Sequence, residues 1–369
     1  MPILCPKRKF QTNGQWDGTH TLATTDVTIR GAGIFGLSIA WACARRGAKV
    51  RVIDPAGVGT GASGGIVGAL APHTPERWEV KKQFQFESLH SASSMWAEVA
   101  ALSGRDPGYA RCGRIQPLAD EQAVSFAQAR AIEAETLWQG HYSWQIKPAS
   151  DYEGYCPPPA TGLVVHDTLS ARIHPRKAVE ALAVALTKLG VEIVRDGVET
   201  GALVIATGVA GLQELSVQFQ AEVGNGQKGQ AALLAFDGRD LPQLYAEYLH
   251  IIPHSDGTTA IGSTSERYYD DPTTTDDLLD NIIVRARRIC PRLADAPVLE
   301  RWAGLRPRSR HRAPMLGPHP TRPGVFIANG GFKIGFGMAP KVGEVMADLI
   351  LAGHDTIPEE FRIEASLPS

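Results

Sequence analysis

The most regular pattern of apolar and polar positions lies near the start of the chain. Short β-prone runs occupy residues 27–30 and 49–53. Between them, apolar residues recur at helical spacing from Ile34 to Ala44, and a pair of arginines followed by Gly47 marks the helix end. This order predicts a strand, a helix that ends near Gly47, and a second strand.

Three later stretches show patterns of the same kinds. An amphipathic helix is expected from Ile173 to Gly190, with a strand at 191–194 after it. Hairpin-like alternation covers 251–266, and a helical stretch covers 276–288. These patterns fit a second sheet, rich in hairpins and covered by helices.

Three glycines occupy the turn between the first strand and its helix. Gly31, Gly33 and Gly36 follow the spacing G-x-G-x-x-G. The first permits a tight turn, the second lets the backbone approach a pyrophosphate, and the third lets the helix pack closely on the strand. Asp54 ends the second strand, 23 positions after Gly31, where a carboxylate accepts hydrogen bonds from ribose hydroxyls. The pattern predicts a dinucleotide site, with the phosphates at the helix N-terminus.

Composition narrows the class of protein. The 369 residues include 37 Lys and Arg against 39 Asp and Glu, a net charge of −2, so we expect no nucleic-acid partner. No apolar run approaches the ~18 residues of a spanning helix, so no transmembrane segment is expected. Residues 1–25 form a polar leader without the apolar stretch of a secretory signal, which favours the cytoplasm. The sequence leaves a homo-oligomer open.

The cysteines are odd in number and widely scattered along the chain. They are Cys5, Cys43, Cys112, Cys156 and Cys290. Neither a disulfide framework nor a Cys/His metal cluster has this spacing. We therefore expect free thiols and no metal.

The stretch at 59–72 distinguishes FAD from NAD. An NAD-binding unit would normally continue here into another crossover helix, whereas this stretch is a long loop of Gly, Ala and Ser. Such a loop gives backbone amides close access to a large, flat ligand. It resembles the loop that passes the pyrophosphate and ring of FAD in the D-amino-acid oxidase family, which includes glycine oxidases, sarcosine oxidases and D-amino-acid dehydrogenases.

Further stretches resemble the same family, in the same order, over about 27–353. They are 173–179, 203–208, 228–230, 251–266, 302–307, 314–317 and 330–340. The resemblance implies an α/β chain with a Rossmann-like FAD-binding domain (the GR2 type of flavoprotein) and a second α+β substrate domain on a mixed, largely antiparallel sheet. The FAD-binding domain would take 27–80, 170–212 and 300–353, and the substrate domain would take 81–169 and 213–299.

The resemblance also implies which residues contact FAD, bound without a covalent link. They are Gly31, Gly33, Ile34, Phe35, Gly36, Asp54, Pro55, Ala62, Ser63, Val67, Gly68, Ala69, Val198, Ala206, Thr207, Gly208, Gly331, Phe332, Lys333, Ile334, Gly335, Phe336 and Gly337. Among them, Val198 is the nearest match for a backbone contact to adenine. Only 195–201 separates the two strands around it, where family members often insert a β-meander.

Three residues match family positions that act on the substrate. Arg306, in Gly-Leu-Arg-Pro, resembles the carboxylate-binding arginine, whose planar fork suits a carboxylate. Lys333 replaces an arginine of glycine oxidases, and its charge would stabilise a reduced, anionic flavin. His250 replaces a tyrosine and could hydrogen-bond a carboxylate or accept an amine proton. The plainer alternatives are a surface arginine, an exposed lysine and a strand histidine. The tyrosines that could line the substrate pocket near the hairpin are Tyr245, Tyr248, Tyr268 and Tyr269.

The favoured function is FAD-dependent oxidation of the C–N bond of a small amino acid or an N-substituted glycine. The substrate would be a small carboxylate-bearing amine that passes a hydride to flavin N5, and water would hydrolyse the imine. Oxygen or another carrier would accept the electrons. Two alternatives stay open. A 2-hydroxy acid oxidoreductase would need His250 or His73 as a base, and a flavin-binding or redox-sensing protein without turnover would fit the altered residues around Lys333.

Overall fold

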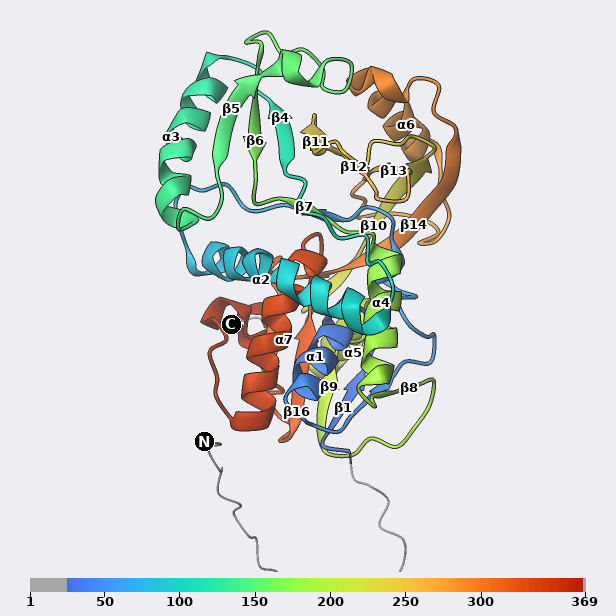
Figure 1. Cartoon of the computed structure of the whole chain (residues 1–369). Coiled ribbons are helices and arrows are strands. Elements are labelled where there is room, and N and C mark those ends of the chain that lie inside the picture. Colours follow the sequence, from blue (N-terminus) through green and yellow to red (C-terminus); the bar gives the residue numbers. More distant parts are fainter. Residues whose placement is uncertain (1–24, 368–369) are drawn as a thin grey trace, which may run out of the picture.

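The computed structural model describes residues 25–367, and most of its strands form two large sheets, one above the other in Figure 1. The predicted leader, except Thr25, and Cys5 lie outside the described residues. The lower sheet has six strands and is mainly parallel, and the upper has eight and is mainly antiparallel. This confirms the predicted α/β architecture with a second, largely antiparallel sheet.

The six-stranded sheet is built around the first strand of the chain. Its order is β15 (Met315–Pro318), β16 (Val325–Asn329), β9 (Ala202–Ile205), β1 (Val27–Arg30), β2 (Val50–Ile53) and β8 (Glu192–Val194). All neighbours are parallel except β15 and β16. The chain passes from β1 to β2 on one side, while β9 flanks β1 on the other. The carboxyl ends of β1 and β9 thus meet where the strand order reverses, and α/β sheets bind ligands at such points.

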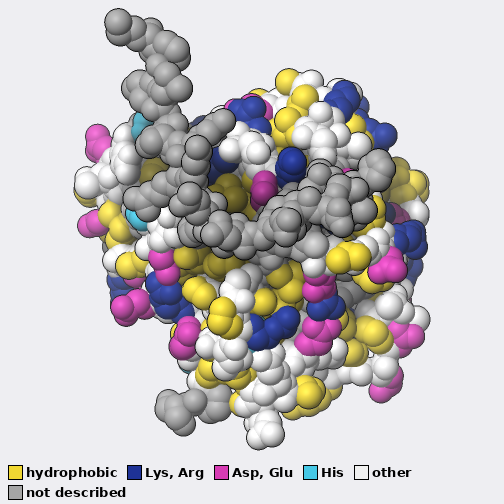
Figure 2. Space-filling model, turned by 90° about the horizontal axis from the view of Figure 1, so that it is seen from below, with side chains coloured by type: hydrophobic (Ala, Val, Ile, Leu, Met, Phe, Trp, Pro, Cys, Tyr) yellow, Lys and Arg dark blue, Asp and Glu magenta, His cyan; other side chains and the backbone are white. Residues whose placement is uncertain are grey.

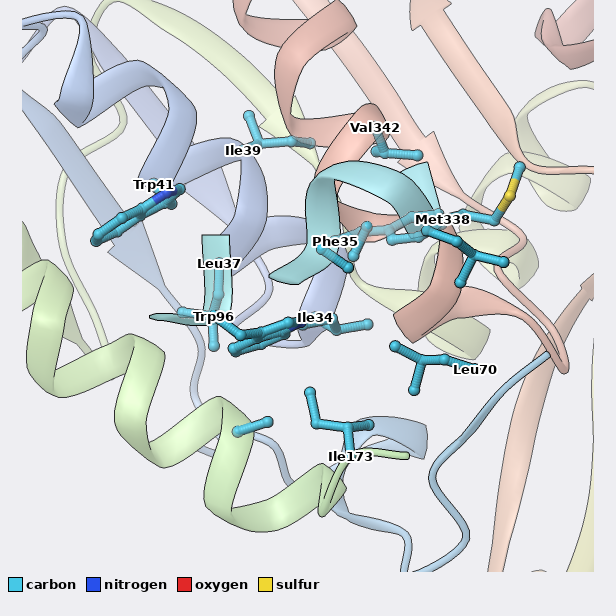
Figure 3. Packing of buried hydrophobic residues seen from close by; sticks show 14 of the residues in the cluster. Ile34, Phe35, Leu37, Ile39, Trp41, Leu70, Trp96, Ile173, Met338 and Val342 are labelled. Carbon is cyan, nitrogen blue, oxygen red and sulfur yellow. The ribbon is translucent and has the colours of Figure 1, made fainter. Parts of the chain in front are cut away.

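Helices cover both faces of this sheet and connect it to the second one. The helices of the described residues are α1 (Ile34–Arg45), α2 (Val80–Ser103), α3 (Glu121–Leu137), α4 (Pro175–Lys188), α5 (Gly208–Gln218), α6 (Asp277–Ile289) and α7 (Gly335–Ala352). Of these, α3 and α6 pack on the eight-stranded sheet instead. α1, α4 and α7 share one core with α2, and α5 lies over the opposite face. Figure 3 shows this core, in which Phe35 and Leu37 of α1 lie near Trp96 of α2 and Met338 of α7.

The eight-stranded sheet has only one parallel pair, β11 with β4. Its order is β14 (Val298–Ser309), β10 (Gly224–Leu234), β13 (Thr259–Gly262), β12 (Leu249–Pro253), β11 (Gln243–Ala246), β4 (Arg114–Pro117), β6 (Leu163–Asp167) and β5 (Trp144–Pro148). A short pair, β3 (Ala69–Leu70) with β7 (Ala171–Arg172), stands apart from both sheets.

The two faces of the eight-stranded sheet differ in chemistry because side chains alternate along each strand. One face carries Leu244, Ile251 and Ile261, which pack with Leu279 and Ile283 of α6. The register of the strands places the other residues on the opposite face, which we call the polar face. From strand to strand it carries Arg114, Tyr245, His250, Gly262, Ala231, Gly229 and Arg306.

The surface and the helices of the described residues give two further observations. On the face seen in Figure 2, basic and acidic side chains are interspersed outside the grey atoms, so neither sign dominates there. Within residues 25–367, none of the helices combines the length and the apolar character needed to cross a bilayer.

Several elements depart in detail from the sequence-based expectations. β10 starts at Gly224, so the family-like stretch 228–230 lies inside a longer strand. β14 pairs with β10 in the eight-stranded sheet, although residues from 300 onward were assigned to the FAD-binding domain. α2 packs on α4 and α7, although 81–169 was assigned to the substrate domain. The domain boundaries stay a prediction.

Candidate active site

The turn after β1 requires glycine at two positions. Gly31 has a φ of +107°, and a Cβ there would overlap the carbonyl oxygen of Ala206 at the end of β9. A Cβ on Gly36 would overlap the carbonyl oxygen of Gly31. The turn is therefore as tight, and α1 as close to β1, as the glycine spacing predicts.

The N-terminus of α1 presents backbone donors beside this turn. The N–H of Ile34 donates to Ser63 Oγ at 2.9 Å, which ties the glycine-rich loop to the helix. The N–H groups of Phe35 and Gly36 have no acceptor within the helix, because no helical carbonyl groups precede the first turn of a helix. Together with the partial positive charge of the helix end, these donors suit a diphosphate.

Asp54 follows β2 at the same edge of the sheet. Its Oδ2 accepts the N–H of Ala32 at 2.8 Å, and its Oδ1 accepts the N–H of Ala56 at 3.1 Å. These bonds fix the orientation of the carboxylate. Each oxygen keeps a second lone pair, so the carboxylate can still accept hydrogen bonds from a ribose. Pro55 lies beside Asp54 and is exposed.

The end of β9 supplies the third part of the site. Ala206 and Thr207 follow the strand, and Gly208 begins α5. The Thr207 hydroxyl is buried and has no hydrogen-bond partner among the described residues. The hydroxyl lies against Gly211 of α5, where a Cβ would overlap it, and near the side-chain amide of Asn329.

The glycine-rich loop reaches from α1 to the polar face. Ala62 and Ser63 lie in a short 3-10 helix at Ala62–Gly64, and Ala69 begins β3. A Cβ on Gly262 would lie 3.0 Å from Cγ2 of Val67, so this loop lies directly on the sheet. The carbonyl of Gly68 accepts the N–H of Ile173 at 2.9 Å, which anchors its far end to the chain before α4.

The turn before α7 closes the site from the other side. The N–H of Phe332 donates to the carbonyl of Pro307 at 3.0 Å, and a Cβ on Gly331 would lie 3.0 Å from Cζ of Phe35. The turn therefore bridges α1 and β14. The remaining residues of this predicted set lie in it or in the first turn of α7: Lys333, Ile334, Gly335, Phe336 and Gly337.

These observations fit an FAD molecule. Tight glycine turns, free helix amides and an oriented carboxylate line one edge of the six-stranded sheet, and the loop that leaves this edge reaches the polar face. Val198 is the predicted contact that fits least well, because it is 70% exposed and its carbonyl accepts a hydrogen bond from Arg51. Its contact with adenine stays a prediction. Within residues 25–367, no three His, Cys, Asp or Glu side chains gather as metal ligands would.

Arg306 lies on the polar face with its guanidinium over Gly229, where a Cβ would overlap it. Its Nη2 donates to Ser263 Oγ at 2.6 Å, and its Nη1 donates to the Thr264 carbonyl at 3.2 Å. Burial lowers the pKa of Arg306 to about 10, opposed by the negative charge of Glu266, so the group is still cationic at neutral pH. An oriented, largely desolvated guanidinium is well suited to bind a carboxylate.

His250 and Lys333 lie close enough to Arg306 to feel its charge. Burial, followed by the positive charges of Arg114, Lys333 and Arg306, lowers the pKa of His250 to about 3. Burial and the charge of Arg306 also lower the pKa of Lys333. His250 Nδ1 is buried, and no described residue hydrogen-bonds to it. The structure thus brings the three predicted catalytic residues into one cationic cluster, which an anionic ligand would stabilise.

Two residues at this cluster were missed or only partly anticipated. Arg114 is buried on β4 and pairs with Asp167, but nothing in its local sequence distinguishes it from a surface arginine. Tyr245 was one of four candidate tyrosines, and its ring lies 4.6 Å from that of His250, centroid to centroid. Of the other three, Tyr248 and Tyr268 are 87% and 92% exposed. Only the register of the sheet could have separated them.

The two remaining candidates, Tyr269 and His73, hydrogen-bond to other residues of the protein. Tyr269 donates its hydroxyl to the Gly226 carbonyl at 3.3 Å. His73 hydrogen-bonds through Nδ1 to Gln85 of α2, and burial lowers its pKa. Both side chains therefore have structural partners of their own.

Comparisons with known proteins agree with this geometry. The family model described as FAD dependent oxidoreductase (DAO) matches residues 26–349. A bifunctional ThiO/ThiG protein of Nostoc sp. is 26% identical over 357 residues, which is 89% of this chain and 53% of that protein. The chain spans about half the length of three such ThiO/ThiG proteins. Glycine oxidase of Bacillus licheniformis is 22% identical over 353 residues, 88% of this chain and 93% of that enzyme.

The fold of the whole chain is also found among solved structures. Iminodiacetate oxidase from Chelativorans sp. BNC1 superposes with a TM-score of 0.79 at 22% identity, over 91% of this chain and 98% of that one. At this identity the likeness concerns the fold. With a family model that covers most of the described residues and a site that fits its cofactor, this chain belongs to the DAO family of FAD-dependent oxidoreductases.

Proposed function

We propose that the protein oxidises the C–N bond of a small amino acid or of an N-substituted glycine. The observation that carries this proposal is the guanidinium of Arg306, fixed over Gly229 beside His250 on the face that the glycine-rich loop covers. Glycine oxidase and iminodiacetate oxidase, which resemble the chain, are named for amines of this class.

The chain's own residues orient the substrate. Arg306 holds the carboxylate through paired N–H donors, which fixes the neighbouring carbon relative to the sheet. The small residues beside it, Gly229, Ala231 and Gly262, leave room for the substrate on the polar face. When bound, FAD supplies the acceptor for a hydride from that carbon. The amine proton goes to solvent, and water hydrolyses the resulting imine to a carbonyl compound and an amine or ammonia.

His250 acts in this proposal as a neutral partner. With a pKa near 3 it is uncharged at neutral pH, and the unprotonated nitrogen of a neutral imidazole can accept a hydrogen bond from the substrate amine. The same property weighs against oxidation of a 2-hydroxy acid, because a general base works best when its pKa lies near the working pH. Lys333 contributes positive charge at the edge of the site beside α7.

The test is anaerobic reduction of the purified flavoprotein, followed by the visible flavin absorbance. Amino acids and N-alkylglycines should bleach the band, and hydroxy acids of the same size should not. Arg306→Ala should abolish bleaching by carboxylates, whereas Arg301→Ala, which removes an exposed arginine paired with Asp280, should leave it intact. A band that hydroxy acids bleach and amines do not would refute the proposal.

The electron acceptor belongs to the same proposal, with oxygen or another carrier in that role. In air, hydrogen peroxide formed in step with substrate loss would identify oxygen. Turnover that appears only with an added artificial acceptor would identify another carrier.

A further inference from the structure

Arg114 is a buried arginine whose hydrogen-bonding capacity is mostly unused. The residue is 6% exposed. Its Nε donates to Asp167 Oδ2 at 3.0 Å, while Asp167 Oδ1 accepts the N–H of Ser170 at 2.8 Å. Nη1 and Nη2 find no partner among residues 25–367, yet neither is sealed from solvent. The N–H donors on these two nitrogens therefore have no acceptor within the described protein.

Two other arginines of the described chain, Arg172 and Arg111, use terminal nitrogens to bond to the protein. Nη1 of Arg172 donates to the carbonyls of Arg239 and Pro253. Arg111 donates through both terminal nitrogens to carbonyl oxygens and a tyrosine hydroxyl. Those side chains are held by the protein, as buried polar groups normally are. The free fork of Arg114 requires another explanation.

The fork of Arg114 faces the candidate active site. Its Cζ lies 5.9 Å from the centroid of the Tyr245 ring, which in turn lies 4.6 Å from that of His250. Arg306 reaches the same histidine from the other direction, because it bonds to Ser263, the residue after the register partner of His250. His250 therefore lies between two guanidinium groups on the polar face.

We propose that Arg114 binds a second anionic group of the substrate, so that the preferred substrates are amines with two carboxylates. This inference rests on the proposed function, in which Arg306 takes the carboxylate next to the reacting carbon. A guanidinium has donors and no acceptor, so a free fork binds only acceptors, and its planar pair of N–H groups matches a carboxylate. The second carboxylate can be carried on the nitrogen, as in N-carboxyalkyl glycines, or on the side chain, as in acidic amino acids.

Matched pairs of amines test this proposal by anaerobic flavin reduction. N-methylglycine against iminodiacetate examines a carboxylate on nitrogen, and alanine against aspartate, in both enantiomers, examines one on the side chain. In at least one pair the dicarboxylate should reduce the flavin with about 10- to 100-fold higher efficiency, as expected for a charge-assisted hydrogen bond. Arg114→Met should remove this preference, because it lowers the efficiency of the dicarboxylate far more than that of the monocarboxylate, and Arg114→Lys should restore part of it.

Folding needs its own control, because Arg114→Met leaves the buried Asp167 carboxylate without its partner. The double variant Arg114→Met/Asp167→Asn removes both charges together and should fold with bound FAD. Arg301→Met removes an exposed arginine from the opposite face of the sheet and should keep the wild-type preference. A higher KM for the dicarboxylate alone supports binding by Arg114. An equal rise in KM for both members of a pair would mean that Arg114 is only structural.

Binding of unreactive acids separates this inference from the proposed function. Succinate should perturb the flavin spectrum at lower concentration than propionate does, and Arg114→Met should erase the difference. If no amine reduces the flavin, the proposed function fails, but the Arg114-dependent preference for succinate still supports a second anion site. Equal binding of the two acids to the wild type would overturn the inference. So would loss of FAD from both Arg114 variants, because the fork would then face the cofactor.

Discussion

A single methyl group at position 229 should disable carboxylate binding and leave the cofactor in place. In Gly229→Ala the new Cβ would overlap the Nη1, Nη2 and Cζ atoms of Arg306. Because these atoms end a flexible side chain, the guanidinium moves and strand β10 stays. The moved group loses its hydrogen bonds to Ser263 Oγ and the Thr264 carbonyl, and it no longer points at the substrate carboxylate.

The size of the effect follows from the bond that is lost. A hydrogen bond to a charged group contributes about 1.5–3 kcal/mol, and about 1.4 kcal/mol corresponds to a factor of ten. Losing one such bond to the substrate lowers kcat/KM by about 10- to 100-fold. Stability should change little, because alanine in a strand interior is about 0.5–1 kcal/mol more favourable than glycine.

The assay compares glycine or N-methylglycine with the corresponding amide, which lacks the carboxylate. Gly229→Ala should slow flavin reduction by the acid and leave the slower reaction of the amide unchanged. Arg306→Lys, which keeps the charge and loses the fork, should reproduce this pattern. If Gly229→Ala binds FAD and keeps the wild-type kcat/KM for the acid, then carboxylate binding does not depend on the position of the Arg306 guanidinium.

Three further predictions concern stability and reactivity. Gly36→Ala should lower the melting temperature by several degrees, because the new Cβ would overlap a backbone carbonyl oxygen. Gly337→Ala, at the equivalent position of α7, is the control: its Cβ would meet only a leucine methyl at 3.4 Å, so the melting temperature should stay the same or rise. His250 gains a proton below its ordinary pKa of 6.5 in the unfolded chain, but only below a pKa of about 3 in the folded protein, so acidification from pH 6.5 toward pH 3 lowers the free energy of unfolding. The melting temperature of His250→Gln should therefore fall less between about pH 7 and pH 5 than that of the wild type. Burial raises the pKa of Cys43 to about 12, so peptide mapping after alkylation should find this thiol modified only in unfolded protein.

The elements around the nucleotide site were predictable because their signals are local. Gly31 and Gly36 lie within one turn, and the strand and helix that flank them carry their own periodicity. Arg306, Lys333 and His250 at the substrate site were reached through a family resemblance. Their mutual proximity could not be derived from spacing, since it depends on which strands of the larger sheet are neighbours.

Arg114 illustrates what the sequence could not provide. It comes close to His250 because β4 pairs with β11 in parallel, and this pairing joins segments far apart in the chain. The sequence could not show which of the four tyrosines lies at the site, for a related reason. Tyr248 lies in the β11–β12 turn with a φ of +62°, so it is exposed, while Tyr245 three positions earlier faces the site. Side-chain direction in a hairpin depends on where the turn falls, and residue type alone does not fix it.

The pairing of α1 with α7 and of β9 with β16 has a consequence for biosynthesis. The ribosome completes α1 early, but α7, which packs on it, begins only at Gly335. Until then, apolar side chains such as Phe35 lack the neighbours that α7 supplies, and contacts between such distant segments form slowly. A nascent chain of this design depends on shielding by chaperones during translation, and overproduction at high temperature should favour inclusion bodies over soluble flavoprotein.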